Sequence, residues 1–327
     1  MQTTKTIYRV LVALIAAFAV TGWGSIVALA EDFDGPGTPA GSMAPAPSLI
    51  AQSSGFELET PAEAGAQPIK PSYAMPLPEP VPPFPILLNR AVRRYVSDFM
   101  SSPDHLQDTF DRSHPYLPDM VRVLRSYGLP DDLVYLAFAE SEFSKSGRGP
   151  WQFNTDTARR FGLHIDDYVD ERRDPVISTK AAAEYLATLH DEAGDDWPMT
   201  VVAWNNGDRA IGRYWSLRGP RMEKFGNRLP RRTRGLLGRF MAVAYIAHHA
   251  DSYGIVPIKL DEPPVYQMLS VSGGTPLSRV ALNHGTTLER LHELNPALLR
   301  DIVPPNERSY RVRVPMDTHA SAEHVEF

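Results

Sequence analysis

Between Leu87 and Tyr253, hydrophobic positions recur at helical spacing and are separated by short stretches of Gly, Pro or Asp. Residues three, four and seven apart share one face of a helix, so this spacing predicts a series of amphipathic helices. The clearest segments are ILLNRAVRRYVSDFM, LPDMVRVLRSYG, DDLVYLAFAESEF, DPVISTKAAAEYLATLHDEAG and RRTRGLLGRFMAVAYIAHHADSYG. We therefore expect residues 87–257 to form a helical domain.

Some helix ends are marked by residues with known positional preferences. Pro130 with Asp131 and Asp132 is typical of a first helical turn, because proline fits there and acidic side chains suit the positive end of the helix. Asp174 is followed by Pro175, which predicts another helix with Asp174 as its capping residue.

After Pro257 the pattern changes. The segments YQMLSVSG and SYRVRVP alternate as strands do, and PLSRVALNHG and LERLHELNP between them have the spacing of short helices. Residues 264–316 are therefore predicted to form a small α+β module in the order strand, helix, helix, strand, a size that suits binding. We expect the fold class to be mainly α, with residues 317–327 as a disordered tail.

The first 30 residues have the features of an export signal. Lys5 and Arg9 precede an apolar run from Val10 to Val27, and Ala28-Leu29-Ala30 offers a cleavage site of small residues. The run is also long enough to span a bilayer, so residues 1–30 are interpreted as a signal peptide or, alternatively, as an uncleaved membrane anchor. Either interpretation predicts a periplasmic or cell-envelope protein. An uncleaved segment would anchor it in the inner membrane and would be its only contact with the membrane.

Residues 31–86 are rich in Pro, Ala, Gly and Ser, and many of the chain's 30 prolines lie here. Such a composition has too little clustered apolar surface to offset the entropy lost on ordering, so we predict a disordered linker.

The composition excludes several kinds of chemistry. The chain has no cysteine, which rules out disulfides, a thiolate nucleophile and cysteine-ligated zinc. Its formal net charge of −6 provides no overall attraction for nucleic acid. The segment from Arg218 to Arg239 is locally basic, and it is either a surface for an anionic polymer or lipid headgroups or a plain solvated face. We find no nucleotide-binding fingerprint and expect no cofactor.

One acidic residue stands on an apolar helix face. Leu133, Leu136, Ala137 and Glu140 share one stripe, whereas Glu142 lies about 200° further round and should face water. Apolar surroundings raise the pKa of a carboxyl group, which suits a general acid that works near neutral pH. The alternative is a glutamate at the edge of the core that pairs with a nearby arginine.

The order of motifs in residues 90–253 resembles a known family. The segments YGLPDDLVYLAFAES, GPWQF, GLHIDDYVDERRDPVISTKAAAEYLATLH, AWNNG and LPRRTRGLLGRFMAVAYI follow one another as in family 1 lytic transglycosylases of the murein transglycosylase D type. The segment from Tyr266 to Pro315 is similar to a degenerate LysM-type glycan-binding module. The resemblance implies a lysozyme-like (SLT) domain at 87–257 that acts on peptidoglycan glycan strands, with a cell-envelope protein complex as a further candidate partner.

The same resemblance implies roles for residues in the first two motifs. Glu140 would be the sole catalytic acid and base, followed by Ser141 as an orienting hydroxyl. Gln152 would contact the substrate beside the glutamate. Gly149 would allow close approach of the backbone, and Trp151 would pack under the site.

Two further positions carry over, and one departs from the family pattern. Asn205 would hold the sugar N-acetyl group, and Trp204 would keep the aromatic platform of the tyrosine usual there while losing its hydroxyl. The family's tyrosine near the catalytic glutamate is replaced by Leu236, for which Tyr245 or Tyr253 is a candidate substitute. The loop between Glu140 and Gly149 is also shorter than usual.

The implied reaction cleaves the β-1,4 bond between N-acetylmuramic acid and N-acetylglucosamine. Protonated Glu140 would donate to the bridging oxygen and then accept the proton of the muramyl C6 hydroxyl, which gives a 1,6-anhydro product. The alternatives are a catalytically weakened murein-binding scaffold and a lysozyme-type hydrolase that uses water.

Metal chemistry is not expected. His248 and His249 are adjacent on a helix and point about 100° apart, so they do not converge on one ion. The acidic segment 165–174 lacks the glycine and the spacing of a calcium-binding EF-hand loop.

Overall fold

The computed structural model of the chain describes residues 67–69, 79–144, 147–217, 228–257, 259–260 and 265–316. The predicted signal segment, most of the predicted linker and the predicted tail lie outside these ranges. Within them, no helix is both long enough and apolar enough to cross a membrane.

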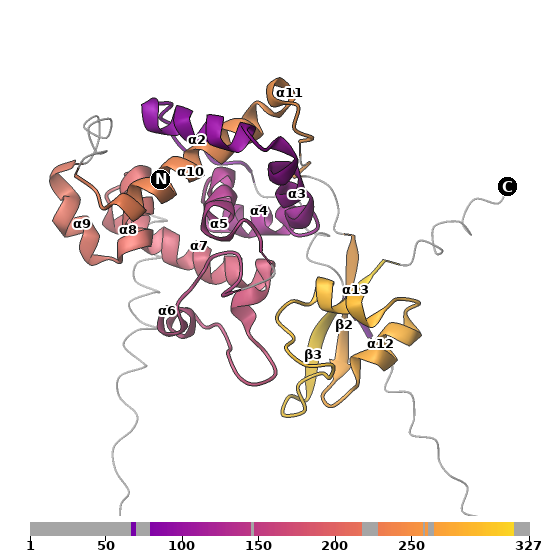
Figure 1. The fold of residues 1–327 in the computed structure, drawn as a ribbon. Helices are drawn as coiled ribbons and strands as arrows, with labels where there is room; N and C mark the ends of the chain where they lie inside the picture. Colours follow the sequence, from indigo (N-terminus) through magenta and orange to yellow (C-terminus); the bar gives the residue numbers. More distant parts are fainter. Residues whose placement is uncertain are drawn as a thin grey trace, which may run out of the picture. The chain divides into compact units, whose positions relative to one another are not determined.

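The prediction of a mainly α fold is confirmed, and helices α2 to α11 gather in one part of the ribbon in Figure 1, whereas α12 and α13 lie with strands β2 and β3. The helices of this part are α2 (Arg90–Met100), α3 (Pro103–Ser113), α4 (Leu117–Ser126), α5 (Val134–Ser141), α6 (Thr155–Arg160), α7 (Pro175–Glu192), α8 (Trp197–Asn206), α9 (Arg209–Tyr214), α10 (Arg231–His248) and α11 (Ala250–Tyr253). Short 3-10 turns are η2 (Asp131–Leu133), η3 (Glu171–Arg173) and η4 (Trp215–Leu217).

Helix α10 lies at the centre of this domain. It packs against α2, α5 and α8, while α4 packs against α5 and α7. Helix α5 was predicted to have one apolar face, but it is buried on nearly all sides, because Val134, Leu136, Ala137 and Phe138 are all buried. Its position in the domain brings its last turn, and with it Glu140, to the lining of a cavity.

Capping follows the sequence signals. The Asp174 carboxylate accepts the backbone N–H groups of Val176 and Ile177, each at 2.9 Å, and so caps α7 as predicted. Asp196 caps α8 in the same way, through the N–H of Met199.

The end of the predicted linker is part of the fold, which corrects the expectation of disorder up to residue 86. Phe84 is buried, and its ring meets Phe240 edge-on with 4.7 Å between the centroids. Its backbone N–H donates to the Asp132 carboxylate at 2.8 Å. The prediction failed here because it rested on the average composition of residues 31–86. A single aromatic side chain that packs into the core can bury enough apolar surface to order the residues beside it.

The C-terminal module has the predicted order, with β2 (Tyr266–Ser272), α12 (Leu277–Asn283), α13 (Leu288–Leu294) and β3 (Ser309–Pro315). Strands β2 and β3 are antiparallel, with Leu269 opposite Val312. A third strand, β1 (Gln67–Ile69), pairs antiparallel with β2 and comes from within the predicted linker. The linker segment therefore contributes to the sheet as well as to the helical core.

Candidate active site

A cavity of about 490 Å³ lies at the junction of α5, α7, α8 and α10. Five predicted site residues line it together, and they come from separate segments of the sequence: Glu140, Trp151, Gln152, Trp204 and Asn205. The other lining residues are Arg148, Phe153, Asn154, Thr157, Arg160, Tyr185, Asn206, Gly207, Asp208 and Arg232.

Glu140 stands in the last turn of α5, where the helix end leaves the core. Burial raises the pKa of its carboxyl group, and a hydrogen bond from Trp204 together with the charges of Arg232, Arg239 and Arg148 offsets only part of that rise. Among the described residues, no arginine forms an ion pair with Glu140. The described contacts therefore do not support the alternative in which Glu140 lies at the edge of the core and pairs with an arginine.

Trp204 supplies a hydrogen-bond donor to Glu140. Its indole Nε1–H donates to Glu140 Oε1 at 3.0 Å. The ring is held edge-on by Trp151 and Phe153 and is tilted against Tyr185, with centroid distances of 5.5, 5.3 and 5.4 Å. Trp204 thus lacks the hydroxyl of the family's tyrosine but supplies another neutral hydrogen-bond donor, its indole N–H. The sequence alone did not predict this hydrogen bond, because it does not show where the indole nitrogen points.

Gln152 occupies a tight turn after Gly149. It has a positive φ of 51°, and its side-chain Nε2 donates to the Gly149 carbonyl at 2.7 Å. Gly149 has φ of 76°, and a Cβ there would lie 1.8 Å from the carbonyl oxygen of Arg172. The close approach at Gly149 is thus to the protein's own backbone, and Gly149 does not line the Glu140 cavity.

Asn205 is oriented by a residue from α10. The Thr233 hydroxyl donates to Asn205 Oδ1 at 2.9 Å and accepts from Asn206 Nδ2 at 2.9 Å. Thr233 is buried, so this arrangement is shielded from competing water. Nothing in the motifs indicated Thr233, because it is 28 residues from Asn205 in the chain.

The polar atoms of Ser141 and Trp151, two further predicted site residues, form hydrogen bonds with other groups of the protein. The Ser141 hydroxyl donates to the Ala137 carbonyl at 3.2 Å and accepts the Phe143 N–H at 3.1 Å, so it closes the end of α5. Trp151 is only 1% exposed and donates from its indole to Thr179 Oγ1 at 2.9 Å. Direct contact of either residue with substrate stays a prediction.

The candidate substitutes for the missing tyrosine lie elsewhere. Leu236 is buried in α10, and Tyr245 and Tyr253 contact each other and do not line the cavity. The tyrosine that does line it is Tyr185 from α7, whose pKa is raised by burial. The sequence did not indicate Tyr185 as a site residue, because a tyrosine on the buried face of a long helix is indistinguishable from an ordinary core residue.

The residues considered for metal binding have separate partners. His248 Nε2 contacts Asp132 Oδ1 at 2.6 Å, and His249 Nδ1 contacts the Tyr245 carbonyl at 2.8 Å. Glu142, expected to face water, is part-exposed and contacts His105 at 3.0 Å. Across the ranges that the structure describes, no cluster of three or more His, Asp or Glu side chains is arranged to hold a metal ion.

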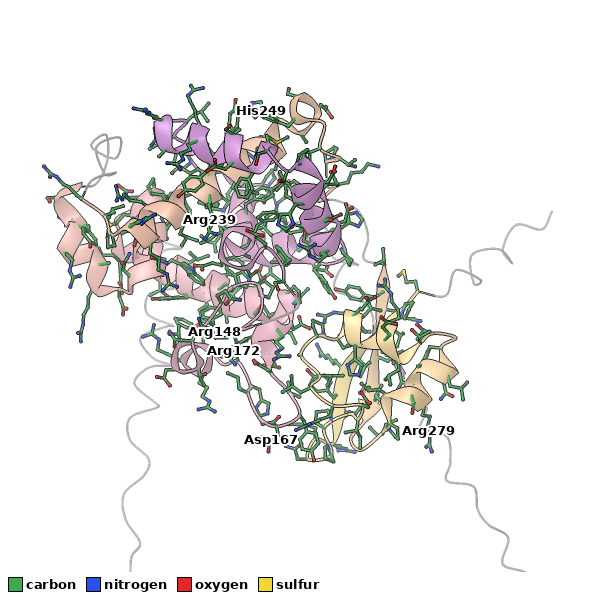
Figure 2. All side chains as sticks on the ribbon, viewed as in Figure 1. Arg148, Asp167, Arg172, Arg239, His249 and Arg279 are labelled. Carbon is green, nitrogen blue, oxygen red and sulfur yellow. The ribbon has the colours of Figure 1, made fainter. Side chains whose placement is uncertain are left out.

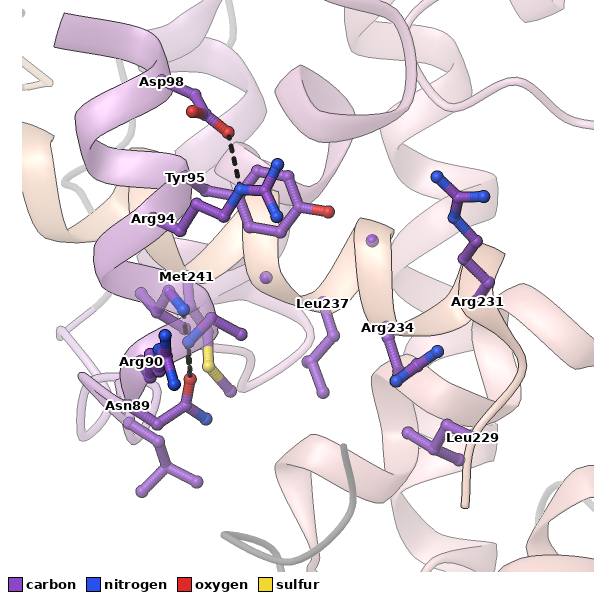
Figure 3. A pocket seen from close by; sticks show the side chains of 15 residues that line it. Asn89, Arg90, Arg94, Tyr95, Asp98, Leu229, Arg231, Arg234, Leu237 and Met241 are labelled. Carbon is purple, nitrogen blue, oxygen red and sulfur yellow. Dashed lines mark hydrogen bonds and ion pairs between the residues drawn. The ribbon is translucent and has the colours of Figure 1, made fainter. Parts of the chain in front are cut away.

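Three arginines in the described part of the basic segment line two different cavities. Arg232 lines the Glu140 cavity. Arg231 and Arg234 line a separate cavity of about 620 Å³ together with Arg90 and Arg94 of α2 (Figure 3). These three arginines thus do not face one common cavity, and residues 218–227 of the segment lie outside the described ranges.

Comparison with known proteins defines the class of both regions. Residues 124–224 match the family model described as transglycosylase SLT domain, and residues 266–326 match the model described as lytic transglycosylase MltD, LysM-like domain. The chain therefore carries an SLT transglycosylase domain with a lysozyme-like fold and an MltD-type LysM-like domain, as the motifs predicted.

At the level of particular proteins, the chain is homologous to membrane-bound lytic murein transglycosylase D of Escherichia coli. The proteins of strains K12 and O6:H1 are each 26% identical over 216 residues, which cover 63% of this chain and 48% of the relative. A protein of Alteromonas sp. (strain M-1), named for tributyltin chloride resistance, is 31% identical over 108 residues, covering 31% of this chain and 52% of the relative. The chain thus spans about half the length of the curated relatives it matches.

Proposed function

We propose that this protein is a peptidoglycan lytic transglycosylase of the cell envelope, exported by its N-terminal segment, with Glu140 as acid and base. The observation that carries the proposal is the position of Glu140, which is a partly buried carboxyl group with a raised pKa beside two neutral amides in one cavity. Homology to a murein transglycosylase supports glycan strands of peptidoglycan as the substrate. The LysM-like module is expected to bind the same polymer.

The reaction uses one proton that leaves and returns. Protonated Glu140 donates to the oxygen that links N-acetylmuramic acid to N-acetylglucosamine, and the bond from C1 to that oxygen breaks. The substrate's acetamido oxygen stabilises the positive charge at C1, as in substrate-assisted glycosidases. Ionised Glu140 then takes the proton of the muramyl C6 hydroxyl as O6 bonds to C1. The product is a 1,6-anhydro sugar, and no water is consumed.

Neutral donors around Glu140 suit this cycle. A cation in contact would hold the carboxylate ionised and make it a poor acid, whereas the indole of Trp204 stabilises the ionised form only modestly. Gln152 and Asn205 are placed to position the sugar without adding charge. Proximity of the C6 hydroxyl, which belongs to the same sugar, lets it compete with bulk water.

Asp208 is the residue that favours the alternative of a lysozyme-type hydrolase. Asp208 also lines the cavity, and a lysozyme-type hydrolase would require a second carboxylate near the scissile bond. Asp208 is exposed, whereas a single buried acid is enough for the intramolecular reaction. The alternative therefore depends on whether Asp208 takes part.

Mass spectrometry of murein digests tests the proposal and both rivals. We expect wild type and Asp208→Asn to release anhydro-muropeptides, and Glu140→Gln to release them about 10²- to 10⁴-fold more slowly. Reducing-end muropeptides that disappear with Asp208→Asn would establish the hydrolase. Retained binding to murein with no product from wild type would establish the non-catalytic scaffold.

A further inference from the structure

The C-terminal module is joined to the helical domain by an ion pair that is buried from solvent. Arg313 on β3 contacts the carboxylate of Asp174 through both terminal nitrogens, with Nη2 to Oδ1 at 3.0 Å and Nη1 to Oδ2 as the second contact. Both side chains are buried, at 5% and 2% exposure for the whole residues. The same carboxylate caps α7, so one group serves both domains.

A loop of the helical domain enters the module beside this pair. The N–H of Asp170 donates to the Ala297 carbonyl at 2.9 Å, and the N–H of Leu299 donates to the Tyr168 carbonyl at 2.8 Å. Val169, which lies opposite Leu298, is one of the buried residues of the module's own apolar core. Asp167, labelled in Figure 2, marks this loop. The module's core is therefore incomplete without a residue of the SLT domain.

The loop contacts the segment that forms one wall of the candidate active site, because Arg172 Nη1 lies 3.4 Å from the carbonyl oxygen of the lining residue Phe153. Asp170 and Arg172 form two hydrogen bonds of 2.8 Å, and Arg172 Nη1 donates to Thr155 Oγ1 at 3.2 Å. The carbonyl of Arg172 lies against Gly149, whose own carbonyl holds the side chain of Gln152. Contacts thus run without a gap from Arg313 to Gln152.

We propose that the C-terminal module is a positioning part of the active site, in which Arg313 and the pairing of residues 168–170 with 297–299 hold the turn that carries Gln152. The inference rests on the proposed function, since Gln152 must be part of the working cavity. It assigns Arg313 as a positioning residue, because it acts on the site through Asp174 and Arg172 and not by touching substrate.

This role differs from that of a tethered binding module. A module that only concentrates the enzyme on its polymer raises the affinity and leaves the turnover of bound substrate unchanged. A module that holds a wall of the cavity affects kcat, because misplacement of a substrate-positioning group by about 1 Å can reduce the rate about 100-fold. The split between kcat and KM therefore separates the two roles.

Point variants of the full chain test the proposal better than truncation, because loss of the module would also uncover Val169 and Asp174. Arg313→Lys keeps the charge but cannot reproduce the two-point contact of a guanidinium. Arg279→Lys is the matched control, because Arg279 lies on the exposed face of α12, away from the helical domain contact (Figure 2). The measurements are steady-state kinetics on a short soluble glycan fragment and hydrogen exchange of the amides of residues 149–155.

We expect Arg313→Lys to lower kcat about 10- to 100-fold and to speed exchange in residues 149–155, while Arg279→Lys changes neither. Unchanged kcat with a raised KM, or unchanged exchange at 149–155, would overturn the proposal. If wild type releases no product, the proposed function fails, and the exchange experiment still decides whether Arg313 holds this turn. Should Arg313→Lys fail to fold, Val169→Ala gives the same two readouts.

Discussion

Glu140, which is partly buried, and Asp174, which is buried, are two carboxyl groups of the same helical domain, and they differ in what surrounds them. Glu140 receives a hydrogen bond from the neutral indole of Trp204, and burial raises its pKa. Asp174 receives two backbone N–H groups and a two-point contact from Arg313.

The difference separates the carboxyl group that we propose to be reactive from a structural one. A buried charge needs paired charges and hydrogen bonds, because the cost of removing it from water is otherwise not recovered. Asp174 has such partners and joins two domains. Among the described residues, the hydrogen bond to Glu140 comes from one neutral donor, and burial raises the pKa of Glu140, so its neutral form is favoured. Under the proposed function, this proton is the one that is transferred.

The largest expected effect on rate comes from Glu140→Gln. We expect murein cleavage to fall by about 10²- to 10⁴-fold, because the general acid and base is lost. Glutamine can still accept the Trp204 N–H, so the free energy of unfolding should not decrease. Release of muropeptides and denaturant unfolding measure the two quantities.

Asp174→Asn is the counterpart of that variant. Asparagine caps a helix about as well as aspartate, but it leaves the Arg313 charge buried without a counter-charge. We expect the free energy of unfolding to fall by about 3–5 kcal/mol. A smaller loss of stability for Asp174→Asn than for Glu140→Gln would contradict the comparison.

Gly149→Ala tests the turn that connects the two carboxyl sites. Its Cβ would meet the Arg172 carbonyl, and its φ is in the left-handed region, so we expect a destabilisation of roughly 2–5 kcal/mol together with reduced activity. Gly162→Ala is the control, because Gly162 has φ of 77° and a Cβ added there would have no atom within 4 Å. Thermal unfolding should show a cost of about 1–2 kcal/mol there.

Trp204→Phe removes the donor to Glu140 and keeps an aromatic ring. The hydrogen bond lowers the pKa of Glu140, so its loss should raise that pKa further and move the basic limb of the kcat/KM profile to higher pH. We expect the maximal kcat/KM to fall roughly 10-fold. Trp215→Phe, at an exposed position, is the control. The assignment would be wrong if the basic limb did not move in Trp204→Phe, or if it moved equally in Trp215→Phe.

Thr233→Val removes the hydroxyl group that orients Asn205. The valine side chain has nearly the same shape as threonine, so the packing should be preserved. We expect kcat/KM to fall roughly 2- to 10-fold, as for loss of one neutral hydrogen bond. Thr188→Val, at an exposed position of α7, should leave kcat/KM unchanged. Steady-state kinetics on soluble glycan fragments compares the two variants.

The smallest effect concerns stability and pH. The pKa of Glu140 is higher in the folded than in the unfolded chain, so its contribution to stability is fully present below the unfolded value of about 4.5 and is lost as pH rises through the folded pKa. Wild type should therefore lose stability relative to Glu140→Gln as pH increases from about 4 to about 8. Melting temperatures of both proteins across that range show whether the difference widens.

Much of the architecture could be predicted from local patterns. The 3.6-residue spacing indicated the helices, the alternation after Pro257 indicated the two main strands, and Asp174 before Pro175 indicated a helix cap. The burial of Glu140 followed from its place on an apolar stripe. These features depend on residues close together in the chain, so the sequence carries them directly.

Other features depend on which distant residues meet. The Trp204 donor to Glu140 spans 64 positions and the Arg313 contact with Asp174 spans 139, and neither pair shows a periodic signal. The roles of Phe84 and of strand β1 were hidden in a proline-rich composition that predicts disorder.

The amino-acid sequence by itself determined the helices, the two-domain order and the residue that bears the candidate acid, because these follow from local propensity and periodic burial. Only the tertiary structure decided which neighbours that acid has and that the C-terminal module shares a core and a buried charge with the SLT domain. The physical reason is that the pKa of a carboxyl group and the energy of an ion pair depend on the dielectric and the partners created by packing, and packing brings together groups that the chain keeps far apart.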